Sequence, residues 1–311
     1  MNDSLIELRG CKSDEELKKV IDLCDAAFPN TQKEYFERHV LKDRTLLPED
    51  TRILLKEGRI VSSVQVFPRS IYLRGDKIDF GGIGNVATLP SQRGKGYAAL
   101  VMQDSLDYIR RKNLPISLLT TTINKYYEKF GFQTVKRHVG LIDLPHPQEY
   151  SHIRIFDASI DLEKVIRLYD QYNTGSTGAI VRNRDYWMSQ FSFCGEDKDL
   201  FLVYEERGDI LGFVRADKKV DRVQVLEFAS ADHREEVVRK LFERLACETN
   251  LSKLEFFVSQ REKSRLTFLD FQPFKIDTDL MVAFVDDNLD VKIKEVLLSE
   301  NELTFWLSDF F

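Results

Sequence analysis

The sequence contains few of the residues that build disulfide frameworks or metal sites. It has four cysteines, Cys11, Cys24, Cys194 and Cys247, and no two of them are spaced as C-x-x-C. Its five histidines never form a pair at helical spacing. Disulfide frameworks are typical of small secreted proteins, and metal sites need clustered ligands. We therefore expect free buried thiols in a reducing cytoplasm, and no metal ion.

Long apolar runs are also missing. No stretch of about 18 apolar residues occurs, which excludes a membrane-spanning helix. The first residues, MNDSLIELRGCKSDEE, lack a basic region followed by an apolar one, so we expect no signal peptide. The formal net charge of −6 argues against a dedicated partner among nucleic acids or anionic membranes. These absences together predict a cytoplasmic protein.

The 311 residues are enough for about two domains. Apolar periodicity predicts two successions of elements. The first contains strands at 5–9, 51–57, 59–74 (interrupted at Pro68), 77–89 and 116–122, helices at 13–28, 31–42, 95–112 and 124–130, and closing strand material at 132–144. The second contains strands at 153–156, 199–206, 209–218, 222–230 and 253–259, helices at 159–172, 183–191, 232–248 and 261–270, and strands near 280–285 and 302–307.

The two successions resemble each other. LKKVIDL at 17–23 and LEKVIRL at 162–168 share five of seven residues, although apolar helix periodicity can also produce such short identities. Ser13 and Ser159 are the expected N-caps of the two helices, and Glu16 completes a capping box. PHPQEYSH at 145–152 is rich in proline and polar residues. We therefore predict a duplicated fold with domains at 1–144 and 153–311 and a linker at 145–152.

One short stretch carries a chemical signal. In PSQRGKGYAAL, residues 90–100, Gly94 and Gly96 separate a predicted strand from a predicted helix. The first amides of a helix have no partners within it, and they attract anions. Glycines let an anion approach this backbone, and Arg93 and Lys95 add positive charge. The alternative is a plain helix entry with solvated cations. The stretch matches neither the P-loop nor the dinucleotide-binding pattern.

A family resemblance rests on this stretch and on a second one. RGKGYA at 93–98 resembles the R/Q-x-x-G-x-G/A signature of the GCN5-related N-acetyltransferases, the GNAT superfamily. NKYYEKFGF at 124–132 resembles the Y-E-K-x-G-F segment of the same family. The resemblance implies an α/β (α+β) chain of tandem GNAT folds. Each fold would have a mixed, mainly antiparallel central sheet flanked by helices.

The resemblance also implies a coenzyme A site in residues 1–144, with acetyl-CoA as co-substrate. The pyrophosphate would lie on the turn, and backbone groups before it would bind the pantetheine arm and polarise the thioester carbonyl. Asn124, the expected N-cap of its helix, would also contact the arm. The residues so implied are Val86, Thr88, Arg93, Gly94, Lys95, Gly96, Tyr97, Ala98 and Asn124.

Tyr127, the tyrosine of the Y-E-K-x-G-F segment, is the predicted general acid for the departing thiolate. The alternative is that its ring only packs against the cofactor arm. The general base is not assigned, because residues 80–89 contain no acid where many family members carry a glutamate. Asp25, Glu34, His39, water and the Phe311 carboxylate all stay open.

The second copy lacks the glycines. Aligning the helices places Glu235 and Val237 at the positions of Gly94 and Gly96. A carboxylate repels phosphate, and a β-branched side chain blocks the backbone. We expect this copy to bind no coenzyme A, and to pack against the first copy or to wall its substrate cleft. This arrangement resembles the Eis-like branch of the superfamily without its sterol-carrier-like domain.

The leading functional hypothesis is an acetyl-CoA-dependent N-acyltransferase that acts by direct attack of a primary amine of a small molecule or peptide. The alternative is a non-catalytic GNAT-like protein that binds a ligand or serves as a scaffold. Transfer of another acyl chain, or of an aminoacyl group from transfer RNA, is a third hypothesis, and the acidic composition disfavours transfer RNA. The sequence leaves the acceptor and the oligomeric state open.

Overall fold

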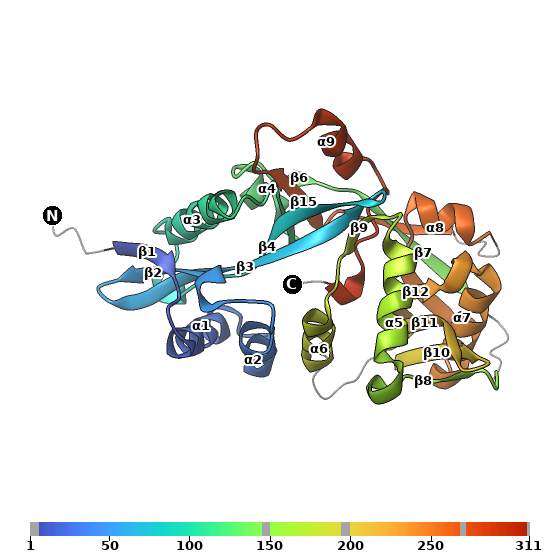
Figure 1. Ribbon diagram of the computed structural model, residues 1–311. Coiled ribbons are helices and arrows are strands. Elements are labelled where there is room, and N and C mark those ends of the chain that lie inside the picture. The colour runs from blue at the N-terminus through green and yellow to red at the C-terminus, as the bar shows by residue number, and fades with distance from the viewer. Residues whose placement is uncertain (1–5, 145–149, 194–199, 268–271, 310–311) are drawn as a thin grey trace.

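The computed structural model describes residues 6–144, 150–193, 200–267 and 272–309. Its described part contains two mixed sheets, side by side, each flanked by helices (Figure 1). In each sheet one neighbouring pair is parallel, and the others are antiparallel. The expected fold class, tandem α/β units with mainly antiparallel sheets, is confirmed.

The first sheet has the order β1-β2-β3-β4-β5-β15-β6, and β9 also pairs with β3. Its parallel pair is β4 and β5. The bounds are β1 (Ile6–Gly10), β2 (Thr51–Lys56), β3 (Arg59–Leu73), β4 (Asp76–Thr88), β5 (Ile116–Thr120), β6 (Gln133–Thr134), β9 (Thr177–Ile180) and β15 (Leu280–Phe284).

The second sheet has the order β14-β7-β13-β12-β11-β10-β8, with β12 and β13 parallel. The bounds are β7 (Arg137–Asp143), β8 (Ile153–Ile155), β10 (Leu200–Glu206), β11 (Asp209–Lys218), β12 (Val223–Ser230), β13 (Lys253–Phe257) and β14 (Gln272–Asp277). The helices are α1 (Asp14–Ala27), α2 (Lys33–Leu41), α3 (Tyr97–Arg111), α4 (Asn124–Glu128), α5 (Ala158–Asn173), α6 (Arg184–Phe193), α7 (Glu235–Thr249), α8 (Gln260–Arg265) and α9 (Val291–Leu298).

Alternation along the strands directs the helices to opposite faces of the first sheet. Leu54 of β2 packs in the cluster that contains the apolar face of α3. Its neighbours Ile53 and Leu55 pack in the cluster that contains α1 and α2. Successive side chains of a strand point to opposite faces, so one strand contributes to both cores. Figure 1 shows α3 on one side of the sheet and α1 and α2 on the other.

The two halves of the chain also share an equivalent ion pair. Arg9 of β1 makes two hydrogen bonds to Glu16 of α1, at 2.7 and 2.8 Å. Arg154 of β8 makes two to Asp161 of α5, at 2.6 and 2.8 Å. Both carboxylates also accept a backbone N–H from the residue four positions before them. The same bidentate clamp therefore joins the first strand to the first helix in both halves.

The predicted helix starts are partly right. Ser13 is the N-cap of α1 and accepts the Glu16 amide, as expected. The capping box is wrong, because the Glu16 carboxylate binds the Lys12 amide and Arg9 instead. Ser159 is not the N-cap of α5. That position belongs to Asp157, whose carboxylate accepts both the amide and the hydroxyl of residue 159.

Pro68 does not interrupt β3, contrary to expectation. The pairing of β3 with β2 ends at Gln65, and its pairing with β9 begins at Ile71. Pro68 lies between these points, where β3 has only β4 as a neighbour. Proline is tolerated where a strand is an edge, since no ladder hydrogen bond is lost there.

Strands cross the boundary that the sequence predicted. β7, from residues 1–144, lies next to β13 in the second sheet. β15, from residues 153–311, lies between β5 and β6 in the first. Each half thus supplies the strand beside the parallel pair of the other. The order of helices and strands alone could not reveal this exchange. The predicted strand at 302–307 is also wrong, because no strand forms there, whereas β9, β14 and α9 were not expected.

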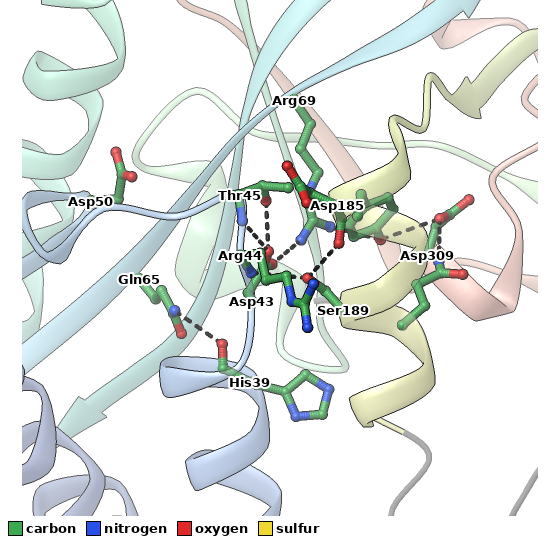
Figure 2. Close-up of polar contacts among 12 residues, drawn as sticks. His39, Asp43, Arg44, Thr45, Asp50, Gln65, Arg69, Asp185, Ser189 and Asp309 are labelled. Carbon is green, nitrogen blue, oxygen red and sulfur yellow. Dashed lines mark hydrogen bonds and ion pairs between the residues drawn. The ribbon is translucent and has the colours of Figure 1, made fainter.

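A buried polar cluster holds the halves together where the segment after α2 meets α6 (Figure 2). Arg69 of β3 donates to Asp43 at 2.6 Å and to the Tyr186 hydroxyl at 2.9 Å. Tyr186 in turn donates to Asp309 at 3.2 Å, and Arg182 donates to the same carboxylate at 2.9 Å. The other four residues of the cluster are buried, and the side chain of Arg69 is buried as well. Residues near both ends of the chain are therefore fixed in one network.

Candidate active site

The glycines of the turn are required by backbone conformation. Gly94 and Gly96 have φ angles of 77° and 81°, which side chains other than glycine rarely adopt. Gly96 is the N-cap of α3, and no side chain caps this helix end. A Cβ added at either glycine would meet nothing within 4 Å. The first amides of α3 thus begin at a turn that borders open space.

Two basic side chains accompany the turn. Arg93 donates from Nη2 to the carbonyl oxygen of Ala27 at 2.8 Å, which ties the turn to the end of α1. Lys95 donates to the Gln92 side chain at 2.8 Å and is exposed. Both cations lie close to the start of α3, where the helix dipole also favours an anion.

A cavity of about 510 Å³, here called the turn cavity, opens beside the start of α3. Its described lining contains two cations, Arg93 and Lys129, and no carboxylate. It is lined by Ala27, Phe28, Val86, Thr88, Gln92, Arg93, Gly94, Gly96, Tyr97, Ala98, Ala99, Ile123, Tyr126, Tyr127 and Lys129. Free helix amides, two cations and no acid suit a phosphate-bearing ligand.

The parallel pair β4 and β5 separates beside this cavity. Its register runs from Phe80–Ile116 to Ile83–Leu119, and β4 then continues to Thr88 without a partner in β5. A bulge follows at Asn85, which has a φ of 49° and donates to the Gln65 side chain at 2.7 Å. A bulge increases local twist and ends pairing. The two strands therefore splay apart after Ile83 and Leu119.

A second cavity, of about 560 Å³, lies in this splay and is here called the splay cavity. It is lined by Phe28, Thr31, Tyr35, Phe36, Ile83, Gly84, Asn85, Val86, Leu119, Thr120, Thr121, Thr122, Ile123 and Tyr127. Apart from the two tyrosines, this lining has no ionisable side chain in the described part of the chain. The turn cavity and the splay cavity share Phe28, Val86, Ile123 and Tyr127.

Tyr127 lies where the two cavities meet. Its ring is 8% exposed and makes edge contacts with Tyr126 and Phe132, with centroids 5.0 and 6.2 Å apart. Burial, with a smaller contribution from Tyr126, raises the pKa of Tyr127 to about 12. Its hydroxyl makes no hydrogen bond to any residue that the structure describes. A neutral phenol with a free O–H can donate a proton or a hydrogen bond.

The other predicted site residues fall into two groups. Val86 and Thr88 both line the turn cavity, and Val86 reaches the splay cavity as well. Asn124 lines neither cavity. It is the first residue of α4, with Ile123 at the N-cap, so the expected N-cap is wrong. Its amide donates to the Thr134 side chain and to the carbonyl oxygen of Thr278, both at 2.8 Å, and so joins α4 to β6 and to the segment just before β15.

Of the described candidate bases, Asp25, Glu34 and His39, none lines the splay cavity. Asp25 and Glu34 are exposed side chains of the α1–α2 region. His39 donates from Nδ1 to the carbonyl oxygen of Tyr35 at 2.8 Å, and burial lowers the pKa of His39. Its ring stacks on Phe193 of α6 with centroids 4.6 Å apart. The Phe311 carboxylate lies outside the described residues.

The second copy has a different helix start. A three-residue 3-10 turn precedes an arginine in both copies, at Pro90–Gln92 and Ala231–His233. α3 then begins four residues after Arg93, whereas α7 begins directly after Arg234. Helical residues thus replace the glycine turn in the second copy. Val237 packs closely on β11: a Cβ added at Gly212 would lie 2.4 Å from the Cγ1 atom of Val237.

The surface beside the start of α7 also carries the wrong charges for phosphate. A cavity of about 430 Å³ there is lined by three carboxylates, from Glu206, Glu235 and Glu236, and by two cations, from Arg234 and Lys240. The turn cavity has no acid in its described lining. The described lining of the two first-copy cavities contains no residue of the second copy. The second copy supports this lining from behind, because Leu280 and Met281 of β15 pair with Thr120 and Leu119. Phe193 also stacks on His39 behind Tyr35.

Sequence reasoning missed the far wall of the site. Phe28, Thr31, Tyr35 and Phe36 come from the end of α1, the connection and α2. The only signal in the sequence is a concentration of aromatic residues around the helix break at Pro29. Nothing local relates these residues to the splay of β4 and β5, some fifty residues further along the chain.

Two further observations concern metals and membranes. In the described ranges, no group of three His, Cys, Asp or Glu side chains is placed to hold a metal ion. Of the cysteines, Cys11, Cys24 and Cys247 are free, and burial raises the pKa of the first two to about 12. Cys194 lies outside the described residues. No helix in the described part of the chain is long and apolar enough to cross a membrane.

Comparison with known proteins points in one direction. Residues 8–135 match the sequence model of the acetyltransferase (GNAT) domain. Among curated protein sequences none matches the chain.

Solved structures share the fold at low identity. A conserved protein from Enterococcus faecalis V583, described as a probable N-acyltransferase, has a TM-score of 0.72 at 17% identity and covers 91% of this chain and 73% of its own. Eis1 from Mycobacterium abscessus has a TM-score of 0.67 at 15% identity, over 91% and 74%. N-myristoyltransferase of Saccharomyces cerevisiae with bound myristoyl-CoA has a TM-score of 0.60 at 13% identity, over 91% and 83%.

Proposed function

Since the chain is a member of the GNAT superfamily, with its acetyltransferase domain at residues 8–135, we propose that it is an acetyl-CoA-dependent N-acyltransferase. The observation that carries the proposal is the junction of two cavities at Tyr127. One cavity suits a phosphate-bearing chain, and the other is a separate chamber for the acceptor. The acceptor is a primary amine of a small molecule or peptide.

The residues of the turn cavity fit coenzyme A. The open amides of α3 and the side chains of Arg93 and Lys95 would hold the pyrophosphate. The backbone of β4 at Val86 and Thr88 would hold the pantetheine arm. When bound, acetyl-CoA supplies the thioester whose acyl group is transferred. No role is proposed for Asn124, because its amide is already committed to other residues.

Tyr127 would protonate the leaving thiolate. Its hydroxyl is neutral at pH 7, is unpaired among the described residues and lies at the entrance to the splay cavity. A positioned general acid contributes about 10² to 10⁴ in rate. Backbone N–H groups near the bulge at Asn85 would polarise the thioester carbonyl.

Calorimetric titration with acetyl-CoA tests the binding step. The matched variants are Gly96→Asp and Gly96→Asn, which have the same shape and differ in charge. Asparagine and aspartate both tolerate a positive φ, and nothing lies where their Cβ atoms would go. We expect Gly96→Asp to bind at least about tenfold more weakly than Gly96→Asn, because a carboxylate then faces the phosphates. Equal affinities would contradict the placement of the pyrophosphate at this turn.

Release of free thiol from acetyl-CoA in the presence of an amine panel tests the reaction. Amine-dependent release supports an enzyme. Binding of acetyl-CoA without thiol release under any condition would favour the alternative, a non-catalytic GNAT-like ligand-binding or scaffold protein. Absence of binding would remove both the cofactor and the enzyme proposals.

A further inference from the structure

We propose that the acceptor is an amine that is uncharged at neutral pH and is attached to an aromatic ring, that is, an arylamine. This inference rests on the proposed function and names its substrate class. It derives from the splay cavity, whose described lining is aromatic on one wall, carries hydroxyl groups on another, and holds no acid.

The absence of a counter-charge is the first step. Cationic substrates are recognised by carboxylates, and a buried charge without a partner is strongly disfavoured. The buried carboxylate of Asp43 is already paired with Arg69 at 2.6 Å. Asp43 does not line the cavity. An ammonium ion would therefore lose its water without gaining a carboxylate.

The faces of aromatic rings can also attract a cation, but the rings of this wall pack against one another. Phe36 stacks with Phe28 at 5.7 Å between centroids and meets Tyr35 edge-on at 5.3 Å. His39 lies against Tyr35, with centroids 4.1 Å apart. An apolar planar body can extend this group of rings by offset or edge contacts. Such a wall favours an aromatic ring over an ammonium group.

The polar groups of the cavity suit a neutral amine. Thr120, Thr121 and Thr122 provide hydroxyl groups, and Asn85 provides an amide. A neutral N–H₂ group donates two hydrogen bonds and retains a lone pair, so these acceptors can orient it without a formal charge.

The chemistry of the step agrees with a described lining that contains no carboxylate or histidine to act as a base. The nitrogen lone pair attacks the thioester carbonyl carbon, a C–N bond forms, and the C–S bond breaks. The sulfur takes a proton from Tyr127, and the amide nitrogen gives up one proton to solvent or to the tyrosinate, so the products are an N-acyl arylamine and a free thiol. An alkylammonium group must first lose a proton, and only about one in 2,500 is deprotonated at pH 7. An arylamine needs no base for that.

Two isomers test the inference: p-toluidine, an arylamine, and benzylamine, an alkylamine protonated at pH 7. We follow thiol release from acetyl-CoA with the full chain between pH 6.5 and 9. We expect kcat/KM for p-toluidine to exceed that for benzylamine at least about tenfold at pH 7 and to stay nearly flat with pH. The value for benzylamine should rise about tenfold per pH unit, following its free-base fraction.

A variant pair reverses the preference. Thr31→Asp places a carboxylate in the splay cavity, and Thr31→Asn is its neutral control. We expect Thr31→Asp to raise kcat/KM for benzylamine relative to p-toluidine at least about tenfold over Thr31→Asn. The inference is overturned if acetyl-CoA binds in calorimetry and wild-type protein prefers benzylamine at pH 7, or accepts neither isomer. If acetyl-CoA does not bind at all, the proposed function itself fails.

Discussion

Tyr126 and Tyr127 are neighbours in α4 with different surroundings. Tyr127 borders both cavities, whereas Tyr126 lines only the turn cavity. The Tyr126 hydroxyl is buried without a hydrogen-bond partner among the described residues, and Lys129 lies over its ring at 4.0 Å. Their rings are nearly perpendicular, at 86°. Only one of them can therefore act on a group that lies between the cavities, and the pair provides a matched comparison.

We expect Tyr127→Phe to lower kcat about 100-fold or more while leaving the affinity for acetyl-CoA nearly unchanged, because it removes a proton donor and little packing. Steady-state kinetics and calorimetry measure the two quantities. Tyr126→Phe is the control and should retain kcat within about threefold. A Tyr127→Phe enzyme with full turnover would leave the tyrosine only a packing role.

Because the Glu16 carboxylate of the Arg9–Glu16 clamp titrates, we expect the free energy of unfolding to depend on pH. The hydrogen bonds from Arg9 hold the pKa of Glu16 at about 2, below its unfolded value. A depressed folded pKa stabilises the protein above the unfolded pKa, and that contribution is lost as pH falls from about 4.5 to 2. The side chain of Glu16 is 19% exposed, so solvent screening is moderate.

We expect Glu16→Gln to lower the free energy of unfolding at pH 7 by about 1 to 2 kcal/mol, as for a hydrogen bond between charged groups. Urea denaturation at pH 7 and pH 3 measures the difference between the variant and the wild type. The difference should shrink at pH 3. A difference that stays constant over this range would mean that the clamp contributes through packing and not through charge.

At the scale of elements, α3 and α7 occupy equivalent places in the two halves but begin differently. Both follow a 3-10 turn and an arginine, and the difference is whether glycines keep the chain out of the helix for three residues. Where helix formation starts at once, as at Glu235, acidic residues occupy the position at which phosphates would have to lie.

We therefore expect one molecule of acetyl-CoA to bind per chain. In calorimetry, Lys95→Glu should weaken binding about tenfold, because it reverses a charge beside the free amides. Glu235→Lys reverses a charge at the start of α7 in the second copy and should leave affinity and stoichiometry unchanged. A stoichiometry of two, or an effect of the Glu235 variant equal to that of the Lys95 variant, would contradict an inactive second copy.

At the scale of the whole molecule, the exchanged strands make the halves depend on each other. β15 brings Leu280, Met281 and Val282 into the cores of the first sheet, and all three are fully buried. Burying each such side chain stabilises a protein by about 1.5 to 3 kcal/mol, and a domain has only about 5 to 15 kcal/mol in total. Without β15, β5 would also lose the hydrogen bonds of one edge.

We expect a fragment of residues 1–144 to show no cooperative thermal unfolding in circular dichroism, although the sequence suggests a complete domain there. Co-expression with residues 145–311 should restore a cooperative transition, since both exchanged strands can then pair. A fragment that unfolds cooperatively on its own would show that the predicted boundary separates independent units despite the exchange.

What the sequence determined by itself is local. The N-cap at Ser13, the helix faces, the repeated LKKVIDL pattern and the glycine turn at 94–96 follow from backbone conformation and from side-chain spacing over a few residues. Tyr127, Val86 and Thr88 line one cavity, because the two motifs lie on elements that meet at the sheet, and their roles stay predictions.

What only the tertiary structure decided depends on contacts between distant residues. The aromatic wall at 28–36, the commitment of Asn124 to Thr278, and the exchange of β7 and β15 join segments up to about 165 residues apart. The backbone hydrogen bonds of a strand can form with any strand of matching apolar pattern. The local sequence therefore does not determine which strand becomes its neighbour. The choice is made by the burial of a complete core, and that same core leaves a chamber beside Tyr127 whose described lining carries no charge.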